Sequence, residues 1–290
     1  MSRVVGFVGL GKMGGPMAAN VAAAHRGLLC FDPAGTAERA PAGSVIADSV
    51  GDLAQRCDTL LLSVPDGAAT LGVVAQILAL EHGVHVTTII DLSTIGPPAA
   101  TDAAAQLAAR GIAYCDGPVS GGAAGARART ISLMFGGPTA ILDAHRDLLQ
   151  SFAGNVFHVG ELAGQGQAMK LLNNFLSATA LAATSEALAF GLHHGLDLTT
   201  MVDVLNVSTG RNSATVDKFP NRIIPGRFDA GFATAHMTKD VRLFEAGAVE
   251  AGTTHRVAAA VTATWQQTDA ALPGSDFTEV WKYVVTSAGE

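Results

Sequence analysis

The chain is short of charge, of aromatic residues and of cysteine, and these shortages exclude several classes of protein. Only 15% of the 290 residues are charged and 49% are hydrophobic, which predicts a well-packed chain without long disordered tails. The net charge is −7, and no run of like charge exceeds two or three residues. Because phosphate binding needs a basic surface, we expect no nucleic-acid partner.

The cysteines and histidines show no pattern of a metal site. Cys30, Cys57 and Cys115 are scattered, odd in number and without a C-x-x-C pair. This is typical of reduced core thiols in a cytoplasmic protein, not of a disulfide framework or a zinc site. The nine histidines lack H-E-x-x-H or similar spacing, so we expect no metal.

We expect neither a signal peptide nor a membrane span. The first apolar stretch breaks at glycines, and no A-x-A site follows it. The alanine-rich segment 168–192 is apolar, but Lys170, Asn173, Asn174 and Glu186 interrupt it more often than a spanning helix tolerates. The segment is therefore predicted to be a buried helix.

Strand-like and helical segments alternate up to about residue 160, after which nearly everything reads as helix. Strands are expected at 4–8, 28–31, 59–63, 88–91, 113–115, 131–135 and 156–158, with helices near 15–25, 50–56, 67–80, 98–109 and 139–151. Such alternation predicts an α/β fold with a mainly parallel sheet, of which the last two or three strands need not be parallel. We predict a dinucleotide-binding domain over 1–162 and an all-helical domain over 163–290.

A glycine-rich turn follows the first expected strand directly. In Gly9-x-Gly11-x-x-Gly14, the first glycine makes the tight turn and the second lets the backbone approach a pyrophosphate. The third lets the helix pack closely on the strand. A plain tight turn is the alternative. The residues expected to hold the cofactor here are Gly9, Leu10, Gly11, Lys12, Met13 and Gly14.

An acidic residue ends the second expected strand. Asp32 stands where a carboxylate accepts hydrogen bonds from an adenosine ribose and repels a 2′-phosphate. No arginine follows immediately, and Arg39 lies too far along the chain for a confident substitute. We therefore predict NAD, with NADP as an alternative; the other interpretation is that Asp32 caps the turn at Pro33.

Two further strand ends are expected to form the rim of the cofactor site. Val64 and Pro65 leave one strand through an X-Pro turn, and Ser93 and Thr94 leave the next. Ligands of open α/β sheets bind outside the carboxyl ends of strands, so Thr94 is a candidate near the nicotinamide. Capping of the next helix by Ser93 or Thr94 is the alternative.

A run of small residues, 116–126, follows another strand and contains the candidate carboxylate site. Consecutive glycines expose backbone N–H groups, and a nest of such groups binds anions. We predict that Ser120, Gly121 and Gly122 bind the carboxylate of a small substrate, with a merely flexible loop as the alternative.

The strongest chemical signal is a lysine in an apolar helix. Gly166, Lys170, Asn174 and Ser177 share one face at helical spacing, with leucine and phenylalanine around them. Because an ammonium group is rarely buried without a role, we predict that Lys170 acts as general acid or base and that Asn174 orients the substrate. A lysine whose stem lies along an apolar edge is the alternative.

Three more polar positions are weaker candidates. Lys239 and Phe232 are expected to contact the cofactor, and Lys239 the substrate as well. Arg211, in the polar turn 206–213, could help to hold an anionic substrate.

In combination, four motifs resemble the β-hydroxyacid dehydrogenase family over the whole chain. They are Gly9-Leu10-Gly11-x-Met13-Gly14-x-Pro16-Met17-Ala18-x-Asn20, Asp116-x-Pro118-Val119-Ser120-Gly121-Gly122-x-x-Gly125-Ala126, Gly164-x-Gly166-x-x-x-Lys170-x-x-Asn173-Asn174 and Lys239-Asp240. The resemblance implies a Rossmann domain joined to a helical domain by a long helix carrying the catalytic Lys170, with Asn174 beside it. It also implies substrate carboxylate binding at 120–122, cofactor contacts from Thr94 and Lys239, and a homodimer or homotetramer formed through the helical half.

Within that family, Asp32 makes the chain most similar to the NAD-using 3-hydroxyisobutyrate dehydrogenases. The expected reaction is hydride transfer between NAD and the C3 hydroxyl of a small 3-hydroxy acid, giving the semialdehyde. Alternatives are an NADPH-dependent reductase of succinic or tartronate semialdehyde, and a non-catalytic dinucleotide-binding protein. His236 departs from the family pattern, where an apolar residue is expected, and favours a more polar substrate if it faces the cleft.

Overall fold

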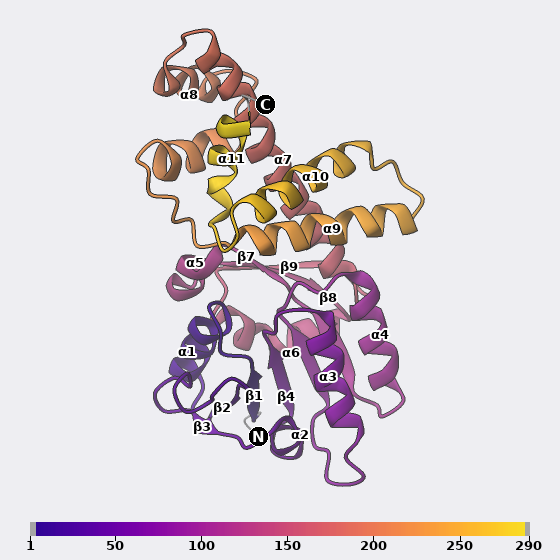
Figure 1. The fold of residues 1–290 in the computed structure, drawn as a ribbon. Coiled ribbons are helices and arrows are strands. Elements are labelled where there is room, and N and C mark those ends of the chain that lie inside the picture. The colour runs from indigo at the N-terminus through magenta and orange to yellow at the C-terminus, as the bar shows by residue number, and fades with distance from the viewer. Residues whose placement is uncertain (1–3, 288–290) are drawn as a thin grey trace. The chain divides into compact units, whose positions relative to one another are not determined.

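The structure is a computed structural model that describes residues 4–287 (Figure 1). By its internal contacts the chain divides into two compact units, Met1–Lys170 and Leu171–Glu290. Each unit has its own hydrophobic core, and the two are described separately.

A nine-stranded sheet forms the centre of the N-terminal unit. Its path runs β3-β2-β1-β4-β5-β6-β8-β7, and β9 pairs with β8. The strands are β1 (Val5–Val8), β2 (Leu29–Phe31), β3 (Val45–Ile46), β4 (Thr59–Leu62), β5 (Thr88–Asp91), β6 (Ala113–Asp116), β7 (Val119–Ser120), β8 (Ser132–Gly136) and β9 (Asn155–Gly160). From β3 to β6 every pairing is parallel, whereas β8 runs antiparallel to β6 and β7 and parallel to β9. The predicted mainly parallel sheet with an irregular last part is confirmed.

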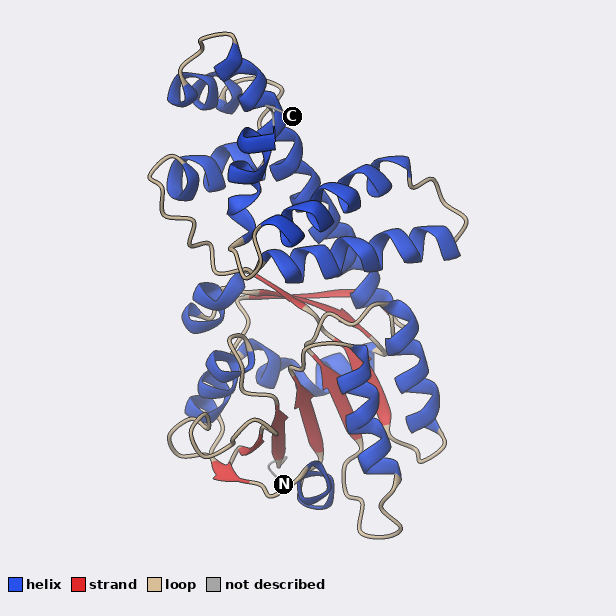
Figure 2. Cartoon of the chain, in the orientation of Figure 1, coloured by secondary structure: helices blue, strands red, loops and turns tan. Residues whose placement is uncertain are grey.

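Alternating side chains give the sheet two buried faces, as a parallel sheet covered on both sides requires. Phe7 and Leu61 enter one core, with residues of α1 and α6, while Val8 and Leu60 enter the other, with residues of α2, α3 and α4. Figure 2 shows these helices flanking the strands. The helices are α1 (Gly14–Ala24), α2 (Val50–Arg56), α3 (Gly67–Leu78), α4 (Pro97–Ala108), α5 (Gly122–Ala128) and α6 (Thr139–Gln150).

Three short elements differ from the sequence prediction. The strands β3 and β7 were not predicted, because each has only two residues, too few to show a hydrophobic period. The segment 122–128 is the helix α5, not part of a loop. Its glycines and alanines carry no amphipathic pattern, and the backbone enters it through Gly121 and Gly122 at φ values of 129° and 64°, which other residues rarely adopt.

The C-terminal unit is helical, as expected. It contains most of α7 (Gln165–His193), followed by α8 (Leu198–Asn206), the π-helix η1 (Ala214–Ile223), α9 (Thr234–Glu250), α10 (Arg256–Ala271), the 3-10 turn η2 (Phe277–Glu279) and α11 (Val280–Ser287). Within residues 171–287 the β pairing is confined to one isolated bridge, Ala233 to Asp276. Trp265 and Phe219 are fully buried in the hydrophobic core of this unit.

The predicted burial of α7 on most sides is wrong. Ala178 and Leu181 are buried, but Leu172 is 44% exposed and Leu176 59% exposed. Among the described residues, α7 is the one helix long and apolar enough to cross a membrane, and 39% of its apolar window is buried. Core helices of helical domains meet the same criterion, so length and composition decide nothing about a membrane here.

Candidate active site

The glycine turn between β1 and α1 has the geometry that a pyrophosphate site needs. Gly9 has φ of 90°, and a Cβ on it would lie 2.2 Å from the Ser63 carbonyl oxygen. A Cβ on Gly14 would lie 2.0 Å from the Gly9 carbonyl oxygen, so helix and strand pack too closely for any side chain. By contrast, a Cβ on Gly11 would meet no atom within 4 Å. The backbone there is open to an approaching ligand, which fits the dinucleotide expected at this turn.

The start of α1 also favours an anion. Met13 precedes the helix without a capping hydrogen bond from its side chain, and the first turn contains no acidic residue. The partial positive charge of this helix end is therefore not offset by a carboxylate of its own first turn.

Asp32, at the end of β2, is buried beside this turn. One carboxylate oxygen, Oδ2, accepts the Leu10 N–H at 2.7 Å, and Oδ1 accepts the Ala34 N–H at 2.8 Å. Asp32 therefore ties the end of β2 to the glycine turn, and it caps the turn at Pro33 as the alternative interpretation held. Its contact with a ribose stays a prediction. Since each carboxylate oxygen has two lone pairs, acceptor capacity for a ribose remains.

The loops after β4 and β5 are tied to each other. The Ser93 hydroxyl accepts the Val64 N–H at 2.8 Å, while the Ser93 N–H donates to Asp91 Oδ1 at 2.9 Å. Helix α4 begins after Gly96 with no side-chain cap, so the capping role considered for Ser93 and Thr94 is wrong. Pro65 is exposed and Thr94 half-buried on this part of the surface.

Two carboxyl groups are buried at the ends of the central strands. Asp91 and Asp116 are register partners in β5 and β6, and each is fully buried. Asp91 accepts hydrogen bonds from the Thr70 and Tyr114 hydroxyls at 2.7 and 3.0 Å. Burial raises the pKa of Asp91, and burial also raises the pKa of Asp116 to about 7, against the opposing effect of two N–H donors.

Asp116 holds the beginning of α7. Its two oxygens accept the N–H groups of Gly164 and Gln167, each at 2.6 Å. No Cβ fits at Gly166 between them, because it would lie 2.6 Å from Asp116 Oδ2. A strand-end carboxyl thus occupies the helix N-terminus in place of a capping residue.

Gln167 then fixes the loop that carries Thr94. Its side chain is fully buried; Oε1 accepts the N–H groups of Ile95 and Gly96 at 2.9 and 3.2 Å, and Nε2 donates to the Ser93 carbonyl at 2.9 Å. Lys170 lies one helical turn further along and is 7% exposed. The candidate cofactor loop and the helix turn before Lys170 therefore form one hydrogen-bonded assembly.

Asn174 is held inside the helical unit. It is 6% exposed, and its Nδ2 donates to Asp240 Oδ2 at 2.6 Å. The other oxygen of Asp240 lies 3.5 Å from the ammonium of Lys239. The carboxylate of Asp240 therefore joins the two predicted residues Asn174 and Lys239, which lie 65 positions apart in the sequence.

The remaining predicted residues lie at the surface or partly buried. Ser120 and Gly122 are half-buried and Gly121 is exposed, next to α5. Phe232 is half-buried before α9, and its ring centroid lies 5.8 Å from that of the exposed His236. Lys12 and Arg211 are exposed.

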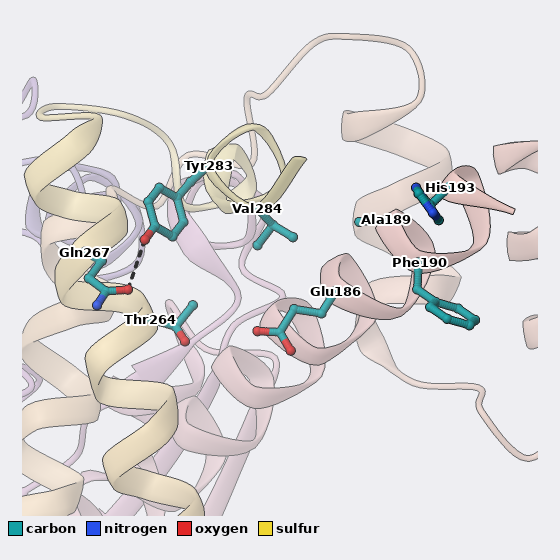
Figure 3. A pocket seen from close by; sticks show the side chains of 8 residues that line it. All are labelled: Glu186, Ala189, Phe190, His193, Thr264, Gln267, Tyr283 and Val284. Carbon is teal, nitrogen blue, oxygen red and sulfur yellow. Dashed lines mark hydrogen bonds between the residues drawn. The ribbon is translucent and has the colours of Figure 1, made fainter. Parts of the chain in front are cut away.

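A pocket of about 470 Å³ in the helical unit contains none of the predicted site residues (Figure 3). It lies among α7, α10 and α11, and the Tyr283 hydroxyl donates to Gln267 at 2.9 Å on one side of it. Its lining is Glu186, Ala189, Phe190, His193, Thr264, Gln267, Tyr283 and Val284. Residues 4–287 contain no group of three or more metal-ligating side chains.

Comparison with known proteins decides the family. Residues 4–160 match the NAD binding domain of 6-phosphogluconate dehydrogenase, and residues 164–284 match the NAD-binding domain of NADP-dependent 3-hydroxyisobutyrate dehydrogenase. The chain is 34% identical to the 3-hydroxyisobutyrate dehydrogenase of Pseudomonas aeruginosa over 96% of this chain and 97% of that protein. This chain belongs to the β-hydroxyacid dehydrogenase family. Like its relatives, it is an NAD(P)-dependent dehydrogenase that transfers a hydride between the cofactor and the hydroxyl-bearing C3 carbon of a small 3-hydroxy acid.

Two further relatives of this dehydrogenase are informative. The NAD-dependent L-serine dehydrogenase of Pseudomonas aeruginosa is 33% identical over 85% of both chains. The solved 3-hydroxyisobutyrate dehydrogenase of Mycobacterium tuberculosis with L-serine superimposes with a TM-score of 0.88, at 30% identity, over 98% of this chain and 99% of that one.

Sequence reasoning assigned no role to Asp116, Gln167 or Asp240, although all three lie inside the motifs. Asp116 could have been found as a lone acidic residue at the end of an apolar strand, whereas Asp240 stands between Lys239 and Arg242 in a charged stretch that gives no such signal. No local signal distinguishes Gln167 from the neighbouring Gln165, because only the fold brings residues 93–96 beside one of them.

Replacing Gln167 by methionine should loosen the hydrogen-bonded contact between the start of α7 and the loop 93–96. Three buried hydrogen bonds are lost and two N–H groups are left without their acceptor, so we expect the free energy of unfolding to fall by about 2–4 kcal/mol. Urea unfolding measures it, and the amides of Ile95 and Gly96 should exchange faster with deuterium. The control Gln76→Met, which removes one exposed bond to Gly72, should change stability by less than about 0.5 kcal/mol. Equal stability of the two variants would show that the Gln167 hydrogen bonds do not stabilise this part of the fold.

Asp116 should make stability depend on pH. Its pKa is near 7 when folded and about 4 when unfolded, so the folded chain binds the extra proton between these values. The stability that this difference in pKa contributes is fully present below about pH 4 and is lost as the pH rises through 7. We expect the free energy of unfolding to fall between pH 5 and pH 8, and to fall by about 2–3 kcal/mol less in Asp116→Asn than in the unmodified chain. Urea unfolding at the two pH values measures this difference. Parallel pH profiles would show that the carboxyl is ionised throughout.

Proposed function

We propose that this dehydrogenase oxidises a 3-hydroxyisobutyrate-like acid to its semialdehyde with NAD, and that Lys170 is its catalytic acid–base. The observation that carries this is the position of Lys170. The Lys170 side chain is nearly buried. It lies one helical turn beyond Gln167, whose side chain binds the loop that carries Thr94. A charge is retained at such a position only where chemistry or a partner compensates its desolvation.

The bound nicotinamide supplies a hydride acceptor at this site, and the chain supplies the proton chemistry. In the proposed oxidation, Lys170 Nζ accepts the proton of the C3 hydroxyl; in the reverse direction it donates a proton to the aldehyde oxygen. Asn174, oriented by Asp240, holds the substrate in place with its amide. The glycine turn, Asp32, Val64, Pro65, Thr94, Phe232 and Lys239 are the proposed cofactor contacts.

The proposed substrate has a carboxylate and a C3 hydroxyl. Both groups occur in 3-hydroxyisobutyrate and in L-serine, the compounds named with the relatives. We propose that backbone N–H groups at Ser120, Gly121 and Gly122, together with the Ser120 hydroxyl, bind the carboxylate, and that Lys239 adds positive charge. The NADPH-dependent reduction of succinic or tartronate semialdehyde remains the second candidate, since a matched family is described as NADP-dependent.

We propose that the working division of the chain falls after residue 162, where the segment leading to α7 begins. Residues 1–162 then bind the cofactor, and residues 163–290 provide substrate and subunit contacts. The three buried free cysteines favour a reducing compartment, and we propose that the enzyme is cytoplasmic.

An exposed apolar stripe along α7 supports self-association into a homodimer or homotetramer. Leu172, Leu176, Ala183 and Phe190 recur at helical spacing on one side, and Phe190 is 68% exposed. Phe190 also lines the pocket of Figure 3, into which a second copy could place an apolar side chain. Burying such a stripe removes apolar surface from water.

Loss of the Lys170 ammonium should abolish turnover without preventing cofactor binding. For Lys170→Met we expect kcat to fall by roughly 10²–10⁴-fold, with NAD⁺ affinity within about twofold. The measurement is nicotinamide absorbance over a panel of 3-hydroxy acids and semialdehydes with NAD(H) and NADP(H), alongside calorimetric binding of NAD⁺. The control Lys282→Met removes an exposed lysine paired with Glu279 and should leave both values unchanged. A variant that keeps most of its turnover would exclude Lys170 as acid–base.

A charged residue in the exposed apolar stripe of α7 should dissociate the proposed homodimer or homotetramer. We expect Phe190→Asp to shift the mass measured by light scattering after gel filtration to that of one chain, because the aspartate would be desolvated in the interface. Val257→Asp, at another highly exposed apolar position on α10, should keep the assembly. Circular dichroism confirms that both variants are folded. The self-association surface is wrong if both variants behave alike.

A further inference from the structure

Asp276 joins the loop that precedes α9 to the segment that precedes α11, although Gly231 in that loop lies 45 positions away in the sequence. One carboxylate oxygen, Oδ2, accepts the Gly231 N–H at 2.7 Å and the Phe232 N–H at 3.3 Å. The other, Oδ1, accepts the N–H and the hydroxyl of Thr278 at 3.1 and 2.6 Å. The two oxygens therefore have separate tasks: Oδ1 caps η2, and Oδ2 binds the loop.

Phe232 is held at both polar groups of its main chain. Its N–H donates to Asp276, and its carbonyl accepts the Phe277 N–H at 2.8 Å. Ala233, the next residue, forms an isolated antiparallel bridge with Asp276. The rings of Phe232 and Phe277 meet edge to face, with 5.8 Å between their centroids and 87° between their planes. Because the backbone sets the direction of Cβ, these contacts fix where the half-buried Phe232 ring points.

A helix cap alone does not need the second carboxylate oxygen. Asp197 caps α8 through Oδ1, which accepts the N–H and the hydroxyl of Thr200, each at 2.8 Å. This repeats the cap that Asp276 makes with Thr278. Serine and threonine cap helices with one hydroxyl oxygen, so a carboxylate is not required for this task. The contacts with the loop distinguish Asp276 from a plain capping aspartate.

The loop itself does little to hold its own conformation. Gly231 has φ of 85°, a value that glycine reaches without strain, and glycine is the residue whose backbone is least restricted. The order of the Phe232 ring must therefore come from outside the loop. A ring that is already ordered binds a ligand more tightly, because binding then costs less conformational entropy.

We propose that Asp276 is a positioning residue for the cofactor, which acts by holding Phe232 through the hydrogen bonds of its Oδ2. The inference rests on the proposed contact between Phe232 and the cofactor, and it is independent of Lys170 and of the proposed acid substrate. Asp276 itself touches neither the cofactor nor the substrate.

A double-mutant cycle on the full chain tests the proposal. Asp276→Ser keeps a hydroxyl oxygen that caps η2 and removes the acceptor of the loop. In calorimetry we expect Phe232→Ala and Asp276→Ser each to lower the affinity for NAD⁺ by roughly 3- to 10-fold. Introduced into the Phe232→Ala chain, Asp276→Ser should change the affinity by less than about 1.5-fold, because the ring that it positions is absent. A merely structural role would weaken binding equally in both backgrounds.

Asp197→Ser is the matched control, since it makes the same substitution at the capping aspartate of α8. It should leave the NAD⁺ affinity unchanged. Circular dichroism confirms that each variant is folded, and Asp276→Thr, which also caps with one hydroxyl, repeats the cycle if the serine variant is not.

The proposal is overturned if Asp276→Ser binds NAD⁺ as tightly as Asp197→Ser does, or if it weakens binding equally with and without the Phe232 ring. An unchanged affinity in Phe232→Ala would instead overturn the proposed contact between Phe232 and the cofactor, and with it this role of Asp276.

Discussion

The carboxyl group of Asp116 is the contact on which the rest of the site depends. It lies at the end of β6 and accepts the N–H groups of Gly164 and Gln167, so the sheet determines where α7 begins. From that point, helical geometry places Lys170 one turn beyond Gln167, whose side chain contacts the loop of Thr94. A shift of this one junction would move the proposed catalytic lysine relative to the proposed cofactor loop. Burial of Asp116 is costly for its ionised form, which its raised pKa reflects.

The same device occurs at three strand ends. Asp32, Asp91 and Asp116 end β2, β5 and β6, and each accepts backbone N–H groups from the segment that must be positioned beside it. In a chain with only 15% charged residues, three buried carboxyl groups at the same edge of a sheet are a large share of its buried charge. Buried carboxyls with several donors define orientation more strictly than apolar contacts do, because a displaced donor leaves a buried polar group without its hydrogen bond. This rigidity suits an enzyme that aligns a hydride and a proton transfer.

Much of this architecture could be predicted from local patterns. The strand before Gly9, the tight packing required at Gly14 and the change to helices after residue 160 each have a periodic or steric signal, and each is confirmed. The helix α5 had no such signal, because alanine and glycine carry no hydrophobic period. The exposed side of α7 was mispredicted for a related reason. Composition shows that a helix is apolar, but not whether its own chain or a second copy covers it.

The sequence by itself determined the strand–turn–helix of the cofactor half, the family motifs and the candidate Lys170, since each depends on neighbours within a few residues. The tertiary structure alone decided which distant groups meet. Arg39 reaches Asp32 because the chain reverses after β2, and Gln167 reaches residues 93–96 because parallel strands bring their carboxyl ends to one edge. Spacing along the chain carries no information about such pairs. Their partners are selected by the packing of the sheet and its helices, which only the complete fold defines.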